Sequence, residues 1–227
     1  MKTRGIDVSH HNGKISWQRV KDSGIDFAYI RVGYSGYDGE IKPDNRFFEN
    51  YKGASDAGLK VGVYIYSYNK DEKSAQKTAR ELSKILKGKN LVMPVAFDVE
   101  ETSHNIFTSK TKDENARLCL SFFNALKNEG FDGILYTYTS FLQNYINIDM
   151  LKDFDLWIAD YRDKTGQSCP YKGDFSIWQY KGNEGRCDGV NGPCDLNFCY
   201  KNYSCDENYK EKYDDLKSAL NDVLKKY

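Results

Sequence analysis

Short β-rich runs alternate with amphipathic helical patterns along most of the chain. The segment Gly58-Leu59-Lys60 shows the change of period clearly, because a helical pattern stops at its glycine and the run VGVYIYSY begins immediately afterwards. Apolar residues recur every three or four positions in the helical patterns and alternate in the strand runs. This alternation favours an α/β fold with a parallel sheet.

Seven runs predict strands, and a further strand is expected near Asp195. The predicted strands span residues 5–8, 27–32, 61–66, 92–97, 133–136, 156–159 and 175–179. The predicted helices span residues 16–23, 45–57, 73–86, 112–129, 140–145 and 207–226. Seven or eight strands in one unit of about 200 residues favour a closed, TIM-like (β/α) barrel over an open sheet. Because the helices thin out in the second half, we expect this barrel to be irregular.

The whole chain is expected to form one domain, with no appended binding module. Residues 1–205 are predicted to form the barrel, and residues 206–227 a C-terminal helix packed on it. An apolar stripe along this last helix indicates docking on the barrel wall, with partner binding as the alternative. The stripe consists of Tyr209, Tyr213, Leu216, Leu220, Val223 and Leu224.

Charge and hydropathy exclude several classes of partner. The 33 basic and 33 acidic residues cancel, so no broad positive field would attract nucleic acid or an anionic membrane. No run approaches the roughly 18 consecutive apolar residues of a membrane span. The N-terminal segment MKTRGIDVSHH lacks the apolar core of a signal peptide. We therefore expect that any secretion signal has been removed or never existed.

Five of the six cysteines crowd into a segment rich in Gly, Asn and Asp, whereas Cys119 stands alone as an expected buried thiol. The clustering predicts disulfides, with Cys187–Cys194 and Cys199–Cys205 as the short-loop pairs, although six cysteines allow 15 connectivities. Zinc binding is the rival interpretation. It is disfavoured because no CxxC pair is present and the three histidines lie far upstream. Disulfides would indicate an extracellular or luminal working place.

The motif FDVE places two acids where a buried strand ends. Side chains two apart in a strand share a face, so Asp98 and Glu100 form a pair. In a parallel barrel this end of the strand faces the active-site rim. Each carboxylate raises the pKa of the other, and an apolar lining adds to the effect. A protonated acid near neutral pH suits glycoside hydrolysis. The alternatives are a metal site completed by EETSHN, or two acids that merely begin a loop.

Two further acids and a set of aromatic residues favour the catalytic interpretation. Asp7 ends the first strand, and Asp195 lies beside the last strand. If these strands are neighbours in a closed barrel, both acids meet at the seam. Aromatic rings placed at strand ends can stack on the apolar faces of sugars. These aromatic residues are Tyr64, Tyr66, Tyr136, Trp157, Tyr161 and Trp178.

In this order, the motifs resemble glycoside hydrolase family 25, the lysozymes of the Chalaropsis type. The resemblance covers residues 4–199 and is carried by GIDVSHHNG, ISW, FAYIRVGYSG, VAFDVE, ILYTYTSFL, LWIADY, WQY and CDLN. It implies an N-acetylmuramidase on an irregular (β/α) barrel. We also expect a monomer, and the cysteines indicate a secreted one. Such an enzyme cleaves the β-1,4 bond between N-acetylmuramic acid and N-acetylglucosamine in bacterial peptidoglycan, without a metal or organic cofactor. Gln179 and Asn197, within WQY and CDLN, complete the expected substrate contacts.

By motif, Glu100 takes the position of the general acid, Asp98 that of the assisting carboxylate, and Asp7 and Asp195 supporting positions. We favour retention of configuration through the substrate's own 2-acetamido group. A carboxylate nucleophile and an activated water remain the alternatives. The chain departs from its resemblance at YIYSY, where many relatives carry a histidine. It also departs in NEGRCDGVNGPCDLN, which is longer than usual, and in the tail after Tyr200.

Two other functions compete with a muramidase. A non-catalytic glycan-binding barrel would be favoured if one of the four acids were missing, and none is. A chitinase-type hydrolase usually shows DxxDxDxE, of which only the final D-x-E is present. The crowded cysteines favour a digestive or antibacterial role over that of a phage lysin.

Overall fold

The computed structural model of the protein describes residues 2–101, 104–163, 165–204 and 217. The strands are β1 (Thr3–Val8), β2 (Phe27–Ser35), β3 (Ile41–Pro43), β4 (Lys60–Tyr66), β5 (Val95–Asp98), β6 (Gly133–Tyr138), β7 (Asp155–Ala159), β8 (Ile177–Lys181) and β9 (Asp195–Cys199). The helices are α1 (Trp17–Asp22), α2 (Phe47–Asp56), α3 (Glu72–Leu86), α4 (Lys112–Asn128) and α5 (Thr139–Tyr145), with 3-10 turns η1 (His10–Asn12) and η2 (Ile148–Leu151).

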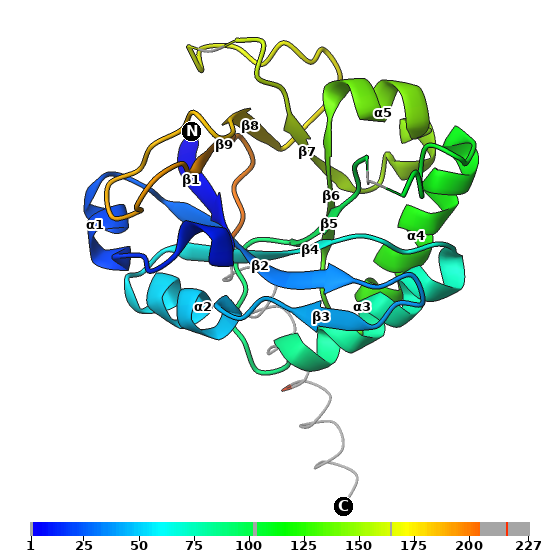
Figure 1. Cartoon of the computed structure of the whole chain (residues 1–227), viewed down its shortest axis with the longest axis horizontal. Helices are drawn as coiled ribbons and strands as arrows, with labels where there is room; N and C mark the ends of the chain where they lie inside the picture. The colour runs from blue at the N-terminus through cyan, green and yellow to red at the C-terminus, as the bar shows by residue number, and fades with distance from the viewer. Residues whose placement is uncertain (1, 102–103, 164, 205–216, 218–227) are drawn as a thin grey trace, which may run out of the picture.

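Eight of the strands close into a barrel. The sheet runs in the order β1-β9-β8-β7-β6-β5-β4-β2-β3, and an additional β1–β2 pairing closes it, with β3 left outside as an edge strand. Figure 1 shows the strands surrounding one interior, with α2, α3 and α4 on the outside. The predicted irregular barrel is confirmed, whereas β3 was not predicted.

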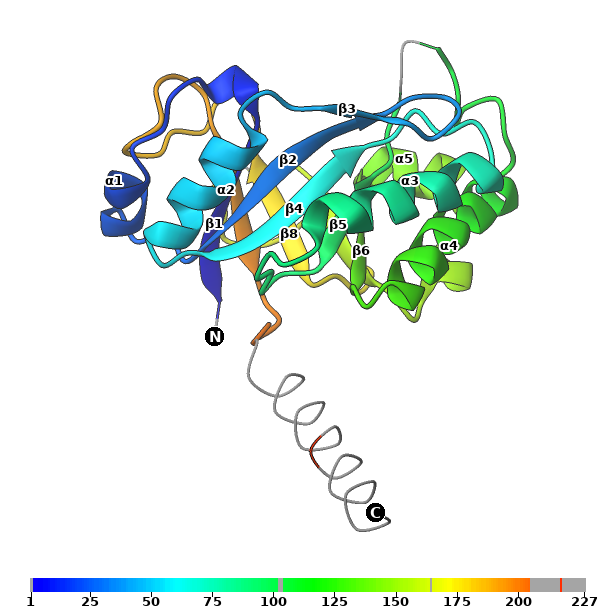
Figure 2. The same cartoon turned by 90° about the horizontal axis from the view of Figure 1, so that it is seen from below.

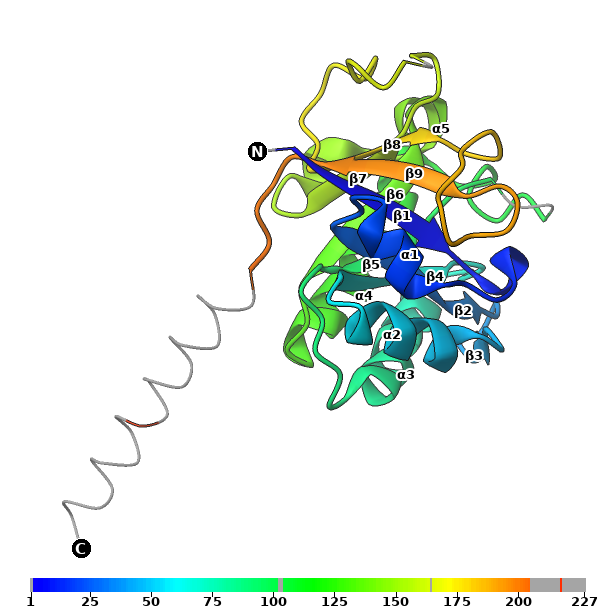
Figure 3. The same ribbon diagram turned by 90° about the vertical axis from the view of Figure 1, so that its left-hand side faces the viewer.

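The last strand runs against its neighbours. β9 pairs antiparallel with both β8 and β1, whereas the pairings from β1 through β2 and β4 to β8 are parallel. Figure 3 shows β9 beside β1. The start of β9 therefore lies at the same barrel end as the carboxyl ends of the parallel strands. The ladder pairs Asp7 with Asp195, as predicted for the seam.

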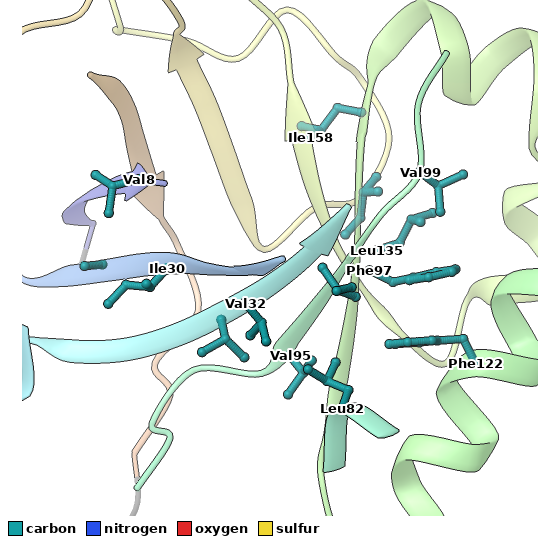
Figure 4. Close-up of a cluster of buried hydrophobic side chains, with 14 of the residues drawn as sticks. Val8, Ile30, Val32, Leu82, Val95, Phe97, Val99, Phe122, Leu135 and Ile158 are labelled. Atoms are coloured by element: carbon teal, nitrogen blue, oxygen red, sulfur yellow. The ribbon is translucent and has the colours of Figure 1, made fainter. Parts of the chain in front are cut away.

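The two faces of each strand pack into separate cores, because alternate side chains point to opposite sides. Outward-facing residues such as Phe97 and Leu135 pack against the helices (Figure 4). Here the ring of Phe97 stacks on that of Phe122 from α4 at 3.9 Å. A smaller cluster that includes Tyr29 and Trp157 fills the barrel interior, and their rings lie 4.4 Å apart. The interior is thus packed below the rim.

The helices cover only part of the barrel. Figure 2 shows α2, α3 and α4 side by side against β2, β4, β5 and β6. Between β7 and β9, the described residues contain no helix, as the sequence predicted. The C-terminal helix predicted over residues 207–226 lies outside the described residues, except for Lys217. None of the described helices is long and apolar enough to cross a membrane.

The prediction of a disulfide between Cys187 and Cys194 is wrong for this structure. The five described cysteines are all free thiols, so the predicted Cys187–Cys194 disulfide is not formed in this structure. The two thiols contact different partners instead of each other. The Sγ of Cys187 lies 3.7 Å from Ser23 Oγ, and the Sγ of Cys194 lies 3.7 Å from the carbonyl oxygen of Asp195. For the Cys199–Cys205 pair, Cys205 lies outside the described residues. Cys119 is a buried thiol, as predicted, and burial raises its pKa to about 12.

Candidate functional site

A cavity of about 530 Å³ opens at the barrel end where β1, β4 and β5 finish and β9 begins. Four carboxyl groups line it, together with one arginine, aromatic rings and loop residues. The lining residues are Asp7, Ser9, His11, Asn12, Arg31, Tyr64, Tyr66, Asp98, Glu100, Tyr136, Trp157, Tyr161, Gln179, Gly182, Asn183, Pro193 and Asp195. A space of this size lies within the usual range of ligand pockets.

Asp98 and Glu100 come from the end of β5 and the residues directly after it. Desolvation raises the pKa of Glu100 to about 7, and the negative charge of Asp7 adds to the shift. Desolvation also raises the pKa of Asp98 well above its ordinary value, with further contributions from Glu100 and Asp7 that the charge of Arg31 partly offsets. The Oδ1 atom of Asp98 is buried and accepts no hydrogen bond from the residues that the structure describes. A ligand N–H group could satisfy this atom.

Asp7 and Asp195 form a second carboxyl pair across the β1–β9 ladder. Burial raises the pKa of Asp195 to about 8, and the charge of Asp7 and a hydrogen bond between the two carboxyls add to the shift. Burial also raises the pKa of Asp7, but Gln179 and Asn197 oppose this by donating hydrogen bonds to its Oδ2 at 2.8 and 2.7 Å. Because Asp7 has two amide donors, the shared proton belongs mainly to Asp195.

Amide and aromatic side chains hold Asp7 in a fixed orientation. The phenols of Tyr136 and Tyr161 both donate to Gln179 Oε1, the former at 2.8 Å, so the amide nitrogen of Gln179 must face Asp7. On the other side, the indole of Trp157 donates to Asn197 Oδ1 at 2.8 Å, which turns the Asn197 nitrogen towards the same carboxylate. The network therefore determines which atom of each amide is the nitrogen and which is the oxygen, an assignment that would be ambiguous for an isolated amide.

The single arginine of the lining is anchored from behind. Arg31 on β2 donates through Nε to Asp44 Oδ2 at 2.9 Å, and the backbone N–H and the Nδ1 of His10 lie within 3.0 Å of the same oxygen. The backbone N–H of Arg46 donates to the other oxygen of Asp44. These donors hold the pKa of Asp44 below its ordinary value against the desolvation that would raise it. The ion pair therefore fixes the position of the Arg31 guanidinium at the cavity wall.

Most of the residues predicted for the site meet in this cavity. The four predicted acids line it, as do Tyr64, Tyr66, Tyr136, Trp157, Tyr161 and Gln179. Asn197 lies beneath the lining, fully buried and bonded to Asp7. Trp178 is the exception: it points to the outer core, where its indole donates to the carbonyl of Asp160. As the neighbour of Gln179 in β8, it takes the opposite face, so its predicted role as a sugar contact is wrong.

The sequence interpretation missed several lining residues. Arg31 was not predicted, although its position gives a signal. It is a charged residue in the apolar strand FAYIRV, and it lies two positions after the inward-facing Tyr29, so it should also face inward. His11 lies in the short 3-10 turn η1, and Asn183 and Pro193 come from loops, so no periodicity predicts their positions. Desolvation, together with the charges of His10 and Arg31, lowers the pKa of His11.

The opposite end of the barrel carries different chemistry. A second cavity of about 570 Å³ there includes Asp155, Lys201 and Tyr203 in its lining. Lys201 and Tyr203 both donate to Asp155, and these hydrogen bonds lower its pKa despite burial. An ionised, fully paired carboxylate suits a structural role. Among the described residues, no group of three or more His, Cys, Asp and Glu side chains is arranged to hold a metal ion.

Comparison with known proteins gives one consistent family. The sequence profile of Glycosyl hydrolases family 25 matches residues 6–190. The autolytic lysozyme of Clostridium acetobutylicum is 31% identical over 194 residues, which is 85% of this chain and 54% of that relative. The chain thus spans about half the length of that relative.

Two solved structures share the fold. The autolysin LytC of Streptococcus pneumoniae, solved in complex with a synthetic peptidoglycan ligand, matches with a TM-score of 0.73 and 29% identity, over 88% of this chain and 47% of that one. A bacterial lysozyme from Streptomyces coelicolor matches with a TM-score of 0.73 and 25% identity, over 88% of this chain and 92% of that one.

Proposed function

The chain belongs to glycosyl hydrolase family 25, and from this premise we propose that it is an N-acetylmuramidase. Its proposed reaction is hydrolysis of the β-1,4 bond between N-acetylmuramic acid and N-acetylglucosamine in bacterial peptidoglycan. The observation that carries the proposal is the gathering of Asp7, Asp98, Glu100 and Asp195 around one cavity, where the pKa of Glu100 rises to about 7. A carboxylic acid that keeps its proton near neutrality can protonate a departing sugar oxygen.

Glu100 acts as the general acid. It donates its proton to the glycosidic oxygen as the bond to the anomeric carbon breaks. In the favoured route the carbonyl oxygen of the substrate's own 2-acetamido group attacks that carbon and forms a cyclic intermediate. Water then opens the ring, and Glu100, now a carboxylate, accepts the proton of that water. The anomeric configuration is retained, because the carbon is inverted twice.

Asp98 orients the acetamido group in this route. Its buried Oδ1 has no hydrogen-bond partner among the described residues, so it is available to accept the acetamido N–H. This contact would hold the carbonyl oxygen towards the anomeric carbon and stabilise the charge that develops during attack. Asp7 and Asp195 have supporting roles. The negative charge of Asp7 helps to keep Glu100 protonated and offers stabilisation to a cationic transition state, whereas Asp195 holds the proton that the two carboxyls share.

The test of the proposal replaces the general acid. Glu100→Gln keeps the shape of the side chain but removes the transferable proton, so clearing of bacterial walls should be abolished while the thermal unfolding midpoint stays close to that of the wild type. Glu129→Gln, at an exposed glutamate beyond α4, is the matched control and should retain activity. Substantial turnover by the Glu100 variant would refute the assignment.

Mass spectrometry of the released muropeptides identifies the bond that is cut. A muramidase leaves N-acetylmuramic acid at the new reducing end. Reducing N-acetylglucosamine would instead indicate a glucosaminidase, and the absence of products together with tight binding to walls would indicate a glycan-binding protein. The substrate lies outside the cytoplasmic membrane, so we also propose that the enzyme works outside the cytoplasm, as a monomer.

A further inference from the structure

Four aromatic side chains gather outside the cavity, on the surface near the ends of β2 and β4. This group, here called the rim aromatic patch, consists of Tyr34, Tyr37, Tyr68 and His104. Tyr34 and Tyr37 are 44% and 43% exposed, and they belong to a set of five exposed large apolar side chains among the described residues. The ring of Tyr34 lies 5.8 Å from that of Tyr68, and His104 lies 6.3 Å from Tyr68 and 5.7 Å from Tyr37.

The rim aromatic patch is continuous with the cavity. The ring of Tyr68 lies 5.0 Å from that of Tyr66, and Tyr66 lines the cavity beside Asp98 and Glu100. β2 and β4 run in parallel, with Tyr34 opposite Tyr66 in the ladder, and both views show these strands side by side (Figures 1 and 2). A chain leaving the cavity past Tyr66 would therefore meet Tyr68 and then Tyr34.

A buried polar network holds the patch in place. Asn69 Oδ1 accepts hydrogen bonds from Ser35 and Ser67 at 3.0 and 3.1 Å, and its Nδ2 donates to Thr78 at 2.8 Å. These four side chains are fully buried. Ser35 also accepts from the backbone N–H of Tyr68. Thr78 donates to the carbonyl of Gly39, in the turn that carries Tyr37.

This network connects the patch to the catalytic strand, because the backbone N–H of Ser67 donates to the carbonyl of Asp98 at 2.9 Å. The backbones that carry the three tyrosines are thus fixed relative to the cavity. A surface that is ordered before binding loses little conformational entropy when a ligand arrives.

We propose that the rim aromatic patch is a second sugar-binding site, which holds the part of a β-1,4-linked N-acetylhexosamine strand that extends beyond the cavity. The inference rests on the proposed function for its substrate class. Tyrosine rings offer both an apolar face for the C–H side of a sugar ring and a hydroxyl for its polar edge. Continuity with the cavity through Tyr66 favours a glycan over a protein partner, because a strand that leaves the cavity past Tyr66 crosses this patch.

Kinetics on long and short substrates test the site. Tyr34→Ala and the double variant Tyr34→Ala/Tyr37→Ala should raise KM for long, soluble peptidoglycan strands about three- to tenfold while kcat stays unchanged. For the shortest cleavable oligosaccharide neither constant should change. Tyr34→Phe keeps the ring and should retain most of the affinity. Tyr200→Ala is the matched control, because Tyr200 is 40% exposed but lies at the end of β9, away from the cavity lining.

Direct binding separates this inference from the proposed function. In the inactive Glu100→Gln background, titration calorimetry with long glycan strands should show affinity reduced by the Tyr34 substitution and unaffected by the Tyr200 substitution. Equal affinity with and without Tyr34, or an equal loss with Tyr200→Ala, would overturn the rim site even if the enzyme is a muramidase. Wild-type protein that binds glycans through the patch but releases no cleaved product would instead overturn the proposed function.

Discussion

At the scale of single residues, the protein keeps protons on carboxyl groups that would lose them in water. Asp98, Glu100 and Asp195 all have raised pKa values, and in each case burial is the largest cause. No cation within the cavity other than Arg31 opposes this among the described lining residues. A cluster of this kind titrates as a unit, so its measured pKa values belong to the group.

The pH dependence of activity should follow the proton on Glu100. Since the general acid must be protonated, kcat/KM should fall as pH rises through about 7. The profile should be measured on soluble glycan strands, where the charge of whole walls does not interfere. Asp7→Asn removes the negative charge that raises the pKa of Glu100 and should move this limb to lower pH. A rate that stays flat up to pH 9 would exclude Glu100 as the proton donor.

Asp98→Asn should slow cleavage strongly. If Asp98 stabilises developing charge, the loss should be about 2 to 4 kcal/mol in the activation free energy, measured as kcat under saturating substrate. Folding should be preserved, because the amide fits the same space. A reduction of less than threefold would assign Asp98 a structural role only.

Gln179→Leu tests the scaffold behind Asp7. The substitution removes a donor to Asp7 and the acceptor for Tyr136 and Tyr161, so buried polar groups lose their partners. The free energy of unfolding should fall by about 1–3 kcal/mol in urea denaturation. Gln143→Leu, at an exposed position of α5, should change it little. Equal stability of the two variants would contradict the role of the network.

The sequence predicted the four acids that line the cavity, but it predicted fewer of the residues around them. The period of two placed Asp98 and Glu100 together, and the expected seam joined Asp7 to Asp195, as the ladder shows. The same period places Trp178 on the opposite face of β8 from its neighbour Gln179, which argues against the predicted sugar contact. Arg31 depends on Asp44, which lies 13 positions further along the chain, and a contact of this kind leaves no periodic signal.

At the scale of elements, strands and helices with a clear period were predicted, and short or reversed ones were not. β3 has three residues and ends in Pro43, too little for alternation to show. The direction of β9 could not be read from its residues, because a strand has the same alternation in either direction. That direction decides the site, since only the reversed strand brings the start of β9 to the cavity rim.

Thr111→Ala tests the start of α4. The hydroxyl of Thr111 accepts from the backbone N–H of Glu114, and the carboxylate of Glu114 accepts from the backbone N–H of Thr111. Loss of this capping box should lower the free energy of unfolding by about 0.5–2 kcal/mol. Thermal unfolding measures it. Ser55→Ala, at an exposed residue of α2, is the control, and an equal effect there would mean that the cap contributes nothing specific.

At the scale of the whole molecule, the ionisation of the cavity acids opposes folding at high pH. Glu100 and Asp195 have pKa values of about 7 and about 8 in the folded protein, against ordinary values of 4.5 and 3.8. The folded state therefore binds protons more tightly than the unfolded state. The stability that these protons contribute is fully present below about pH 4 and is lost as pH rises through 7 to 8.

Chemical denaturation between pH 5 and 9 should show this loss. The free energy of unfolding should decrease with rising pH in the wild type, and the slope should flatten in the double variant Glu100→Gln/Asp195→Asn. Below about pH 4, the free energy of unfolding should instead decrease as pH falls, because the ion-paired acids Asp44 and Asp155 have lowered pKa values and lose their charge there. A wild-type curve with no slope between pH 5 and 8 would mean that the cavity acids are ionised.

The antiparallel pairing of β9 with β1 also determines where additional domains could be fused to the barrel. Thr3, at the start of β1, pairs with Cys199, at the end of β9, so both strand ends leave the barrel on the side away from the catalytic rim. A module joined to the chain directly before Thr3 or after Cys199 would therefore begin on the side of the barrel opposite the cavity, and it would leave the cavity opening clear. For the same reason, a short linker between these ends should yield a circular permutant, with new termini in an outer loop, that still digests cell walls.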